Sequence, residues 1–189
     1  ARKSEEAGVD AVVAEGFEAG GHNGREETTT MVLVPAVKEA VKIPVIAAGG
    51  ISSGRAMLAA FALGAEGVQI GTRFVATPEA SSHDNFKQAV VHASEGDTML
   101  SLKKIVPVRM IKNKFFREVQ AAENAGADEA RLRELLGRAR AKKGMFEGDT
   151  DEGELEIGQV SALIHEIKPA AQIVQEIWQE FTNAPVFPR

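Results

Sequence analysis

A histidine stands inside a glycine-rich stretch near the start of the chain. Residues 16–31 read GFEAGGHNGREETTTM, which places His22 among four glycines. Glycine lets the backbone adopt positive φ and lets a ligand approach the main chain closely, at an entropic cost to folding. Imidazole titrates near neutral pH and serves as a general acid or base. The stretch therefore predicts either a site around His22 or a flexible surface loop that happens to carry a histidine.

Three apolar runs are each followed by glycines that leave the backbone accessible, and each run is predicted to be a buried strand. Strands this apolar are typical of a parallel sheet covered on both faces. The tight repeat of strand, glycine turn and helix favours part of a (β/α)₈ barrel, the TIM barrel, over an open sheet. The predicted strands cover residues 10–16, 43–50 and 66–74.

Helical patterns separate the strands. Each pattern has apolar residues at helical spacing, and two of them carry a recognisable start or stop signal. The predicted helices cover residues 2–7, residues 31–42 with Pro35 in the first turn, and residues 52–65 with Ser52 or Ser53 as the N-cap and Gly64 as the stop.

The glycines at the strand ends predict an anion site. Ligands of parallel α/β folds bind at the carboxyl ends of the strands. Successive glycines let N–H groups converge on an anion, and the helix that follows adds its positive dipole end. These features predict a phosphorylated cofactor, with tight turns alone as the alternative. The residues concerned are Gly20, Gly21, Gly49, Gly50, Gly71 and Thr72.

The second half of the chain has a different pattern. From about Pro78 onward there is little strand signal, so residues 1–80 are predicted to hold barrel units and residues 81–189 a mainly helical region that completes and covers the barrel. An acidic turn at 147–156 lacks the ligand spacing of an EF-hand. The predicted helices cover 81–93, 115–146 with an interruption at 124–128, and 157–181 with a break near Pro169.

Composition excludes several classes of protein. The 189 residues are 44% hydrophobic and 26% charged, and they contain no cysteine, which excludes disulfides and thiolate ligands. The net charge of −5 offers no basic field to nucleic acid or to an anionic membrane. No run is apolar enough to span a bilayer, and we expect a cytoplasmic protein. The chain starts without Met, so we expect the first part of a longer protein to be missing.

Three stretches resemble a known enzyme family. Residues 13–24, 44–74 and 153–169 are similar to the flavin-dependent enoyl-[acyl-carrier-protein] reductase II of the FabK type and to its relatives, the nitronate monooxygenases. The resemblance implies an FMN-binding TIM barrel with an inserted or appended helical region, of which this chain would be the C-terminal part. Glu15, where the monooxygenases often carry Gln, resembles the reductase branch, as do Thr28 and Thr29 and the pattern around Gly148, Asp149, Gly158 and Gln159.

The resemblance also assigns residues. Its AGGH motif corresponds to 19–22 and implies that His22 is catalytic or contacts the substrate. Its AAGGI motif corresponds to 47–51, and its QxGTRF motif to 69–74. The implied cofactor-binding residues are Gly20, Gly21, Gly49, Gly50, Gln69, Ile70, Gly71 and Thr72.

The implied reaction is reduction of a trans-2-enoyl thioester by NADH or NADPH through FMN, with acyl carrier protein or an acyl thioester as partner. A nitronate monooxygenase that uses FMN and O₂ is the second hypothesis, and a phosphate-binding module without catalysis is the third. We also expect a homodimer. The reductases resemble enzymes that are activated by monovalent cations, so the resemblance also implies a monovalent cation as an optional cofactor.

Other polar residues admit two interpretations each. Glu15 and Glu18 bind a cation or orient His22, or else have a helix-cap or solvent role. Arg73 pairs with a phosphate or closes a salt bridge behind the barrel. No metal site is predicted, and His83, His92 and His165 are predicted to be structural or surface residues. A cluster of basic residues is predicted either to bind the acidic acyl carrier protein by charge complementarity or to be a solvated surface. The cluster consists of Lys103, Lys104, Arg109, Lys112 and Lys114.

Overall fold

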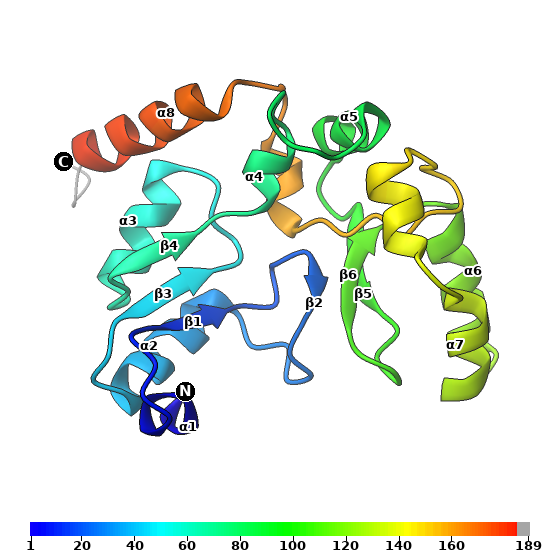
Figure 1. The fold of residues 1–189 in the computed structure, drawn as a ribbon, viewed down its shortest axis with the longest axis horizontal. Coiled ribbons are helices and arrows are strands. Elements are labelled where there is room, and N and C mark those ends of the chain that lie inside the picture. The colour runs from blue at the N-terminus through cyan, green and yellow to red at the C-terminus, as the bar shows by residue number, and fades with distance from the viewer. Residues whose placement is uncertain (185–189) are drawn as a thin grey trace.

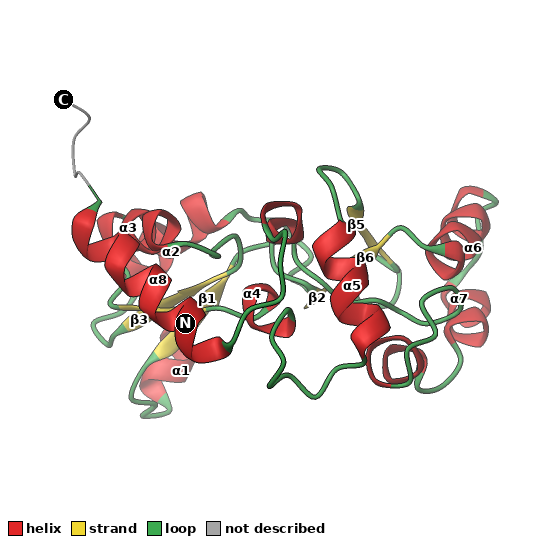
Figure 2. Ribbon diagram, turned by 90° about the horizontal axis from the view of Figure 1, so that it is seen from above, coloured by secondary structure: helices red, strands yellow, loops and turns green. Residues whose placement is uncertain are grey.

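The computed structural model describes residues 1–184 and contains two sheets. Figure 1 shows the two sheets side by side, the first beneath helices α3 and α8 and the second beside helices α6 and α7. The view from above shows an elongated molecule with these helix pairs at opposite ends (Figure 2). None of the helices in the described residues is long and apolar enough to cross a membrane.

The first sheet is parallel, as the sequence predicts. Strand β3 (Val45–Ala48) lies between β1 (Val12–Glu15) and β4 (Gly67–Gln69). Register pairs Val12 with Val45 and Ala48 with Gln69, so the carboxyl ends of all three strands meet at one edge. The described residues form an open three-stranded sheet and no closed barrel.

Helices cover this sheet and bury its apolar side chains. Ser53 caps α3 by accepting a hydrogen bond from the Ala56 N–H at 3.2 Å, and Gly64 follows α3 at φ +98°, both as predicted. Two details differ from prediction. Pro35 lies in the second turn of α2 rather than the first, and a short helix, α4, replaces the end of the third predicted strand. The helices are α1 (Arg2–Glu6), α2 (Thr30–Ala40), α3 (Gly54–Ala62), α4 (Thr72–Val75) and α8 (Ala170–Asn183).

The second sheet is antiparallel, and the prediction of little strand structure after Pro78 was wrong. Strand β6 (Val108–Ile111) pairs with β5 (Thr98–Ser101) on one side and with the two-residue strand β2 (Gly21–His22) on the other. Both missed strands have only four residues, and β6 carries a buried charge, so neither gives the apolar pattern from which buried strands are predicted.

Five helical segments lie between residue 84 and α8. The predicted interruption at 124–128 is confirmed, because Asp128 caps α7. Of the two helices predicted across 157–181, only the second forms, as α8 after Pro169, and the first was wrong because residues 159–163 form only a short 3-10 turn. One apolar core lies between the sheet and the α6–α7 pair, and another joins α5 to the segment that follows Gly153. The segments are α5 (Asp84–His92), α6 (Lys114–Asn124), α7 (Glu129–Leu136), the π-helical turn η1 (Lys142–Phe146) and the 3-10 turn η2 (Gln159–Leu163).

An extended segment at 155–158 joins the two sheets. At one end, the Ile111 N–H of β6 donates to Leu155 O at 2.9 Å. At the other end, the Gln159 N–H donates to Glu18 O, also at 2.9 Å. A Cβ on Gly20 would lie 2.5 Å from the Ile157 carbonyl carbon, so the loop after β1 approaches this segment more closely than a side chain would allow. The segment therefore fixes the first sheet against the second.

Asn113 supports this arrangement with three hydrogen bonds. Its Oδ1 accepts from the Phe116 N–H and caps α6, while its Nδ2 donates to Thr150 O at 2.8 Å and to Gly153 O at 2.7 Å. We expect Asn113→Ala to lower the free energy of unfolding by about 2 kcal/mol, since it removes a cap and leaves two carbonyls without their donor. Asn113→Asp keeps the cap and loses only the donors, so urea unfolding should place it between wild type and Asn113→Ala. Equal loss in both variants would contradict the role of the cap.

Candidate functional site

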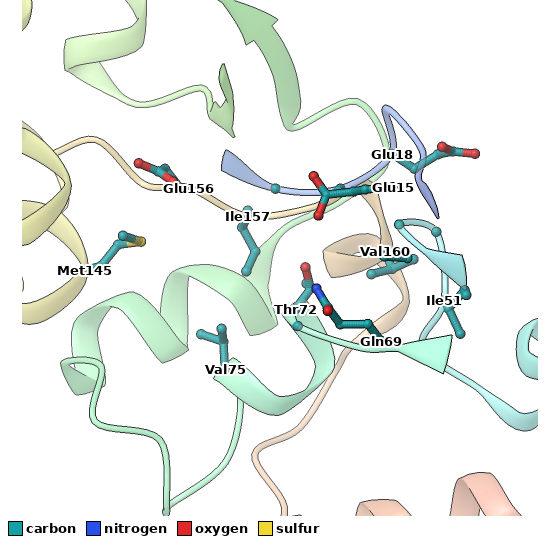
Figure 3. A pocket seen from close by; sticks show the side chains of 16 residues that line it. Glu15, Glu18, Ile51, Gln69, Thr72, Val75, Met145, Glu156, Ile157 and Val160 are labelled. Atoms are coloured by element: carbon teal, nitrogen blue, oxygen red, sulfur yellow. The ribbon is translucent and has the colours of Figure 1, made fainter. Parts of the chain in front are cut away.

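A cavity of about 290 Å³ lies at the carboxyl ends of the three parallel strands. It is closed on its other side by the joining segment and by η1, so both halves of the chain contribute to it (Figure 3). Apolar side chains from 145–160 face polar groups from the strand ends. The lining residues are Glu15, Glu18, Ala19, Gly20, Ala48, Gly49, Gly50, Ile51, Gln69, Gly71, Thr72, Val75, Met145, Glu156, Ile157 and Val160.

The structure brings most of the predicted cofactor-binding residues to this cavity, and three predicted site residues lie elsewhere. Gly21 and His22 form β2 beside the cavity, where His22 is exposed and pairs with Val108. Ile70 packs toward the core of the first sheet. Those in the cavity wall are Gly20, Gly49, Gly50, Gln69, Gly71 and Thr72.

The two strand ends carry free backbone donors on residues of the cavity wall. In the part of the chain that the structure describes, the N–H groups of Gly50, Ile51, Gly71 and Thr72 have no hydrogen-bond acceptor. The Thr72 hydroxyl accepts from the Gly158 N–H at 3.1 Å, which leaves its own proton to donate. Several unpartnered donors on residues of one cavity wall suit an anion. Since no Lys or Arg lines the cavity, an anion there would be held by amides and a hydroxyl.

The shape of the glycine turns matches this role. Gly49 and Gly50 have φ of +85° and +73°, which other residues rarely adopt. A Cβ on Gly71 would meet no atom within 4 Å, so the space over this residue is open to a ligand. Free donors beside an open space, with Ile51, Val75 and other apolar side chains nearby, fit a phosphate joined to an aromatic ring system.

Two acidic residues of the first sheet have different environments. Both oxygens of the Glu18 carboxylate accept from the Thr30 N–H, at 3.1 and 3.0 Å, which makes this side chain a cap for α2. The helix-cap interpretation of Glu18 is therefore favoured over a cation ligand. Glu15 points into the cavity (Figure 3), and burial raises the pKa of its carboxyl.

Sequence reasoning missed the contribution of the joining segment and η1. Glu156 lines the cavity and lies against β2, because a Cβ on Gly21 would be only 2.5 Å from Glu156 Oε2. Met145 lines the same wall. Both residues follow the strand ends by more than 70 positions. The sequence signal for Glu156 is the third stretch of family resemblance, at 153–169, which does not include Met145.

Two arginines lie away from the cavity. Arg109 is 2% exposed, donates to Phe17 O at 3.0 Å and stacks on the Phe17 ring, so its inclusion in a basic surface cluster was wrong. Burial lowers the pKa of Arg109, and the charges of Glu18 and Glu27 oppose this effect. Arg73 is also buried and donates to Glu166 O at 3.4 Å, which favours the structural interpretation over phosphate binding.

The remaining basic residues and histidines have structural partners or open surface. Lys103 pairs with Glu27, and Lys114 pairs with Glu152 and Glu118, so much of the predicted basic cluster is neutralised. His83 caps α5 by accepting from the Asn85 N–H at 3.1 Å, and His92 contacts Gln88 O, as the structural interpretation predicts. Within residues 1–184, no group of three or more His, Asp or Glu side chains could hold a metal ion.

Comparison with known proteins identifies the family. The family model described as nitronate monooxygenase matches residues 1–180. The chain belongs to the nitronate monooxygenase family. A relative from Staphylococcus saprophyticus, named probable nitronate monooxygenase, is 34% identical over 93% of this chain and 52% of its own length. A relative of the same name from Staphylococcus aureus is 37% identical over 92% of this chain and 51% of its own length.

Two solved structures of this family's fold are similar to the chain. FabK from Thermotoga maritima has a TM-score of 0.89 and 47% identity, over 96% of this chain and 57% of that one. A nitroalkane oxidase from Streptomyces ansochromogenes has a TM-score of 0.80 and 34% identity, over 97% of this chain and 55% of that one. The chain thus spans about half the length of its relatives, and the family resemblance predicted from the sequence is confirmed.

Proposed function

We propose that this chain is part of an FMN-dependent oxidoreductase that reduces trans-2-enoyl thioesters with NADH or NADPH. The observation that supports it best is the set of free backbone donors around the cavity, at two neighbouring strand ends of a nitronate monooxygenase family fold. Simple phosphate binding would not need the histidine that stands in the glycine loop, and this disfavours a binding module without catalysis.

FMN fits the residues that surround the cavity. Its phosphate would be held by the amides of Gly50, Ile51 and Gly71 and by the Thr72 hydroxyl. When bound, FMN supplies hydride transfer, and the protein supplies binding and orientation. Val160 and the other apolar residues of the wall would shield the ring from water.

Similarity to the reductase branch supports the choice of substrate. FabK from Thermotoga maritima is 47% identical to this chain, against 34% for the nitroalkane oxidase. Glu15, which resembles the reductase branch, occupies the carboxyl end of β1 and points into the cavity. Acyl carrier protein or an acyl thioester is accordingly the proposed partner.

His22 would act beside the thioester. The transition state of enoyl reduction has enolate character, and a donor near the carbonyl stabilises the charge that develops there. An imidazole at the end of the glycine loop can polarise this carbonyl or relay the proton that the α-carbon takes up. Because His22 is exposed on β2, it has the freedom to turn toward a substrate that enters the cavity.

The test uses the complete protein with FMN under anaerobic conditions. NADH should bleach the flavin absorbance, and a crotonyl thioester should restore it. His22→Ala should slow the second step by about a hundredfold while leaving the first nearly unchanged, since general acid catalysis contributes this much. Bleaching without reoxidation by the thioester would contradict the reductase assignment. His92→Ala, at an exposed position at the end of α5 that does not line the cavity, serves as the matched control.

Nitronate monooxygenase activity is the second candidate. The matching family model and the staphylococcal relatives bear this name. Such an enzyme uses FMN and O₂, so a nitronate should reduce the flavin where NADH does not. The same anaerobic experiment separates the two candidates by which compound bleaches the flavin.

A further inference from the structure

Thr30 lies where strands β1 and β3 of the parallel sheet end. It is the first residue of α2, and it is only 9% exposed. A Cβ on Gly16, which directly follows β1, would lie 2.1 Å from Thr30 Oγ1. The same Oγ1 lies 2.9 Å from Gly49 O and 3.3 Å from Ala48 O, at the end of β3. Thr30 therefore packs against both strand ends that contribute to the cavity wall.

The single proton of the Thr30 hydroxyl has three possible acceptors. Glu18 Oε2, Ala48 O and Gly49 O lie 3.1, 3.3 and 2.9 Å from Oγ1. The Glu18 carboxylate already accepts from the Thr30 N–H, and Ala48 O already accepts from the Gly16 N–H at 2.9 Å. Within residues 1–184, Gly49 O has no other donor. A proton donated to Gly49 O therefore leaves none of the three acceptors unpaired.

The peptide between Gly49 and Gly50 needs a group that fixes its orientation. Both residues have positive φ, +85° and +73°. Since neither has a Cβ, their shared peptide meets little steric resistance to rotation about the bonds that flank it. Its C=O and its N–H would therefore compete for the side that faces the cavity. A carbonyl oxygen on that side would repel an anion, whereas an N–H would bind one.

The hydrogen bond from Thr30 selects one of these orientations. The C=O and the N–H of a planar trans peptide point in opposite directions, and no peptide bond is cis in the part of the chain that the structure describes. Because Gly49 O is held toward α2, the Gly50 N–H is directed away from α2. Gly50 lines the cavity and Thr30 does not.

We propose that Thr30 is a positioning residue of the anion site, which holds the Gly49–Gly50 peptide so that the Gly50 N–H faces the cavity and donates to the phosphate of a flavin nucleotide. Thr30 acts through this peptide and does not itself line the cavity. The proposal rests on the proposed function, in which the phosphate of FMN is bound at this turn.

Glu18 makes the orientation of this peptide more important. A Cβ on Gly50 would lie 3.6 Å from the Glu18 side chain, so a carboxylate stands beside the turn. This charge opposes an anion in the cavity, and it cannot donate to Gly49 O in place of Thr30. Its hydrogen bonds from the Thr30 N–H, at 3.1 and 3.0 Å, hold it at the start of α2. Thr30 therefore restrains both the carboxylate and the peptide that would bind the phosphate.

A comparison of two flavins tests the proposal, because riboflavin has the ring system of FMN but lacks its phosphate. In the complete protein, freed of flavin, Thr30→Val removes the hydroxyl and keeps the branched shape. We expect it to weaken FMN binding about tenfold, since a hydrogen bond to a charged group is lost. The affinity for riboflavin should change by no more than about twofold, because no hydrogen bond to the ring is affected. Quenching of flavin fluorescence measures both dissociation constants.

Two further variants serve as controls. Thr30→Ser keeps the hydroxyl and should bind FMN within about threefold of wild type. Thr29→Val makes the same change one residue earlier, at a side chain that does not cap α2, and should leave both affinities within about twofold. A Thr30→Val variant that loses affinity for both flavins equally would overturn the proposal, because a general loss of structure does not distinguish the phosphate.

The Gly50 amide gives a readout that does not depend on affinity. In the complete protein labelled with ¹⁵N at glycine, the Gly50 resonance is the one that Gly50→Ala removes. Saturating FMN should move its N–H proton downfield, because the N–H then donates to a phosphate oxygen, and riboflavin should not. In Thr30→Val the shift induced by FMN should be lost. A shift that persists in this variant would overturn the proposal.

The outcomes separate the role of Thr30 from the proposed function. Wild-type protein that binds FMN no more tightly than riboflavin refutes the phosphate site and the role of Thr30 together. Wild-type protein that prefers FMN, with a Thr30→Val variant that has the same preference, refutes the role of Thr30 alone. If Thr30→Val loses the preference while no thioester reoxidises the wild-type flavin, the reductase reaction is refuted and the role of Thr30 is supported.

Discussion

Gly49→Ala should lower the free energy of unfolding by about 4 kcal/mol and abolish flavin binding. Gly49 has φ +85°, and an alanine there pays about 1–2 kcal/mol in backbone strain. Its Cβ would also lie 2.6 Å from Gly16 O and 3.2 Å from Ala19 N, both backbone atoms of the loop after β1. That loop must move, and the cavity wall moves with it.

Two neighbouring glycines provide matched controls for Gly49→Ala. Gly50 has φ +73°, but its Cβ would be 3.6 Å from the Glu18 side chain, so Gly50→Ala introduces strain without a clash and should cost about 1–2 kcal/mol. Gly71 has φ −100°, and its Cβ would meet no atom, so Gly71→Ala should change stability by less than about 1 kcal/mol. Urea unfolding and flavin fluorescence measure both effects. A Gly49→Ala variant as stable as Gly50→Ala would contradict the close approach of Gly49 to Gly16 O.

The parallel sheet and its glycine turns could be predicted because their signals are local. Buried parallel strands are continuous apolar runs, and Gly49 and Gly50 stand where the chain must turn at the end of one. Ser53 and Gly64 likewise signal the ends of α3 over a few residues. Local chemistry determines these features, so a single sequence is enough.

The other wall of the cavity could not be predicted because it depends on contacts between distant residues. Glu156 reaches the cavity only because its segment pairs with β6, and β6 is a four-residue strand that carries Arg109. A buried arginine resembles a surface residue until its partner, here Phe17 O, is known. The prediction that Ile70 binds the cofactor was wrong for a related reason. Successive side chains at the end of a strand face opposite sides, so Gln69 faces the cavity and Ile70 faces the core.

Glu154→Gln should stabilise the protein at pH 8 by about 3 kcal/mol and have little effect at pH 4.5. The pKa of Glu154 is near 4.5 in the unfolded chain and about 7 in the folded one. A raised pKa means that the folded state favours the protonated form. The stabilisation is therefore fully present below pH 4.5 and is lost as the pH rises through about 7, with each pKa unit worth about 1.4 kcal/mol. Gln carries no charge to bury at pH 8, so the variant avoids this loss.

Urea unfolding at both pH values measures this effect, with Glu95→Gln as the control. Glu95 is exposed, and its substitution should change stability by less than about 0.5 kcal/mol at either pH. A Glu154→Gln variant that is less stable than wild type at pH 8 would show that the Glu154 carboxylate has a stabilising partner.

The expected gain from Glu154→Gln bears on function as well as on stability. A buried carboxyl that weakens the fold above neutral pH has no structural advantage over its amide, because both fill the same space. Strongly perturbed carboxyls of this kind concentrate at functional sites, where proteins retain them at a cost in stability. Glu154 is buried two residues before Glu156, which lines the cavity. A gain in stability at pH 8 in Glu154→Gln would therefore indicate that this carboxyl is kept for a role other than stabilising the fold.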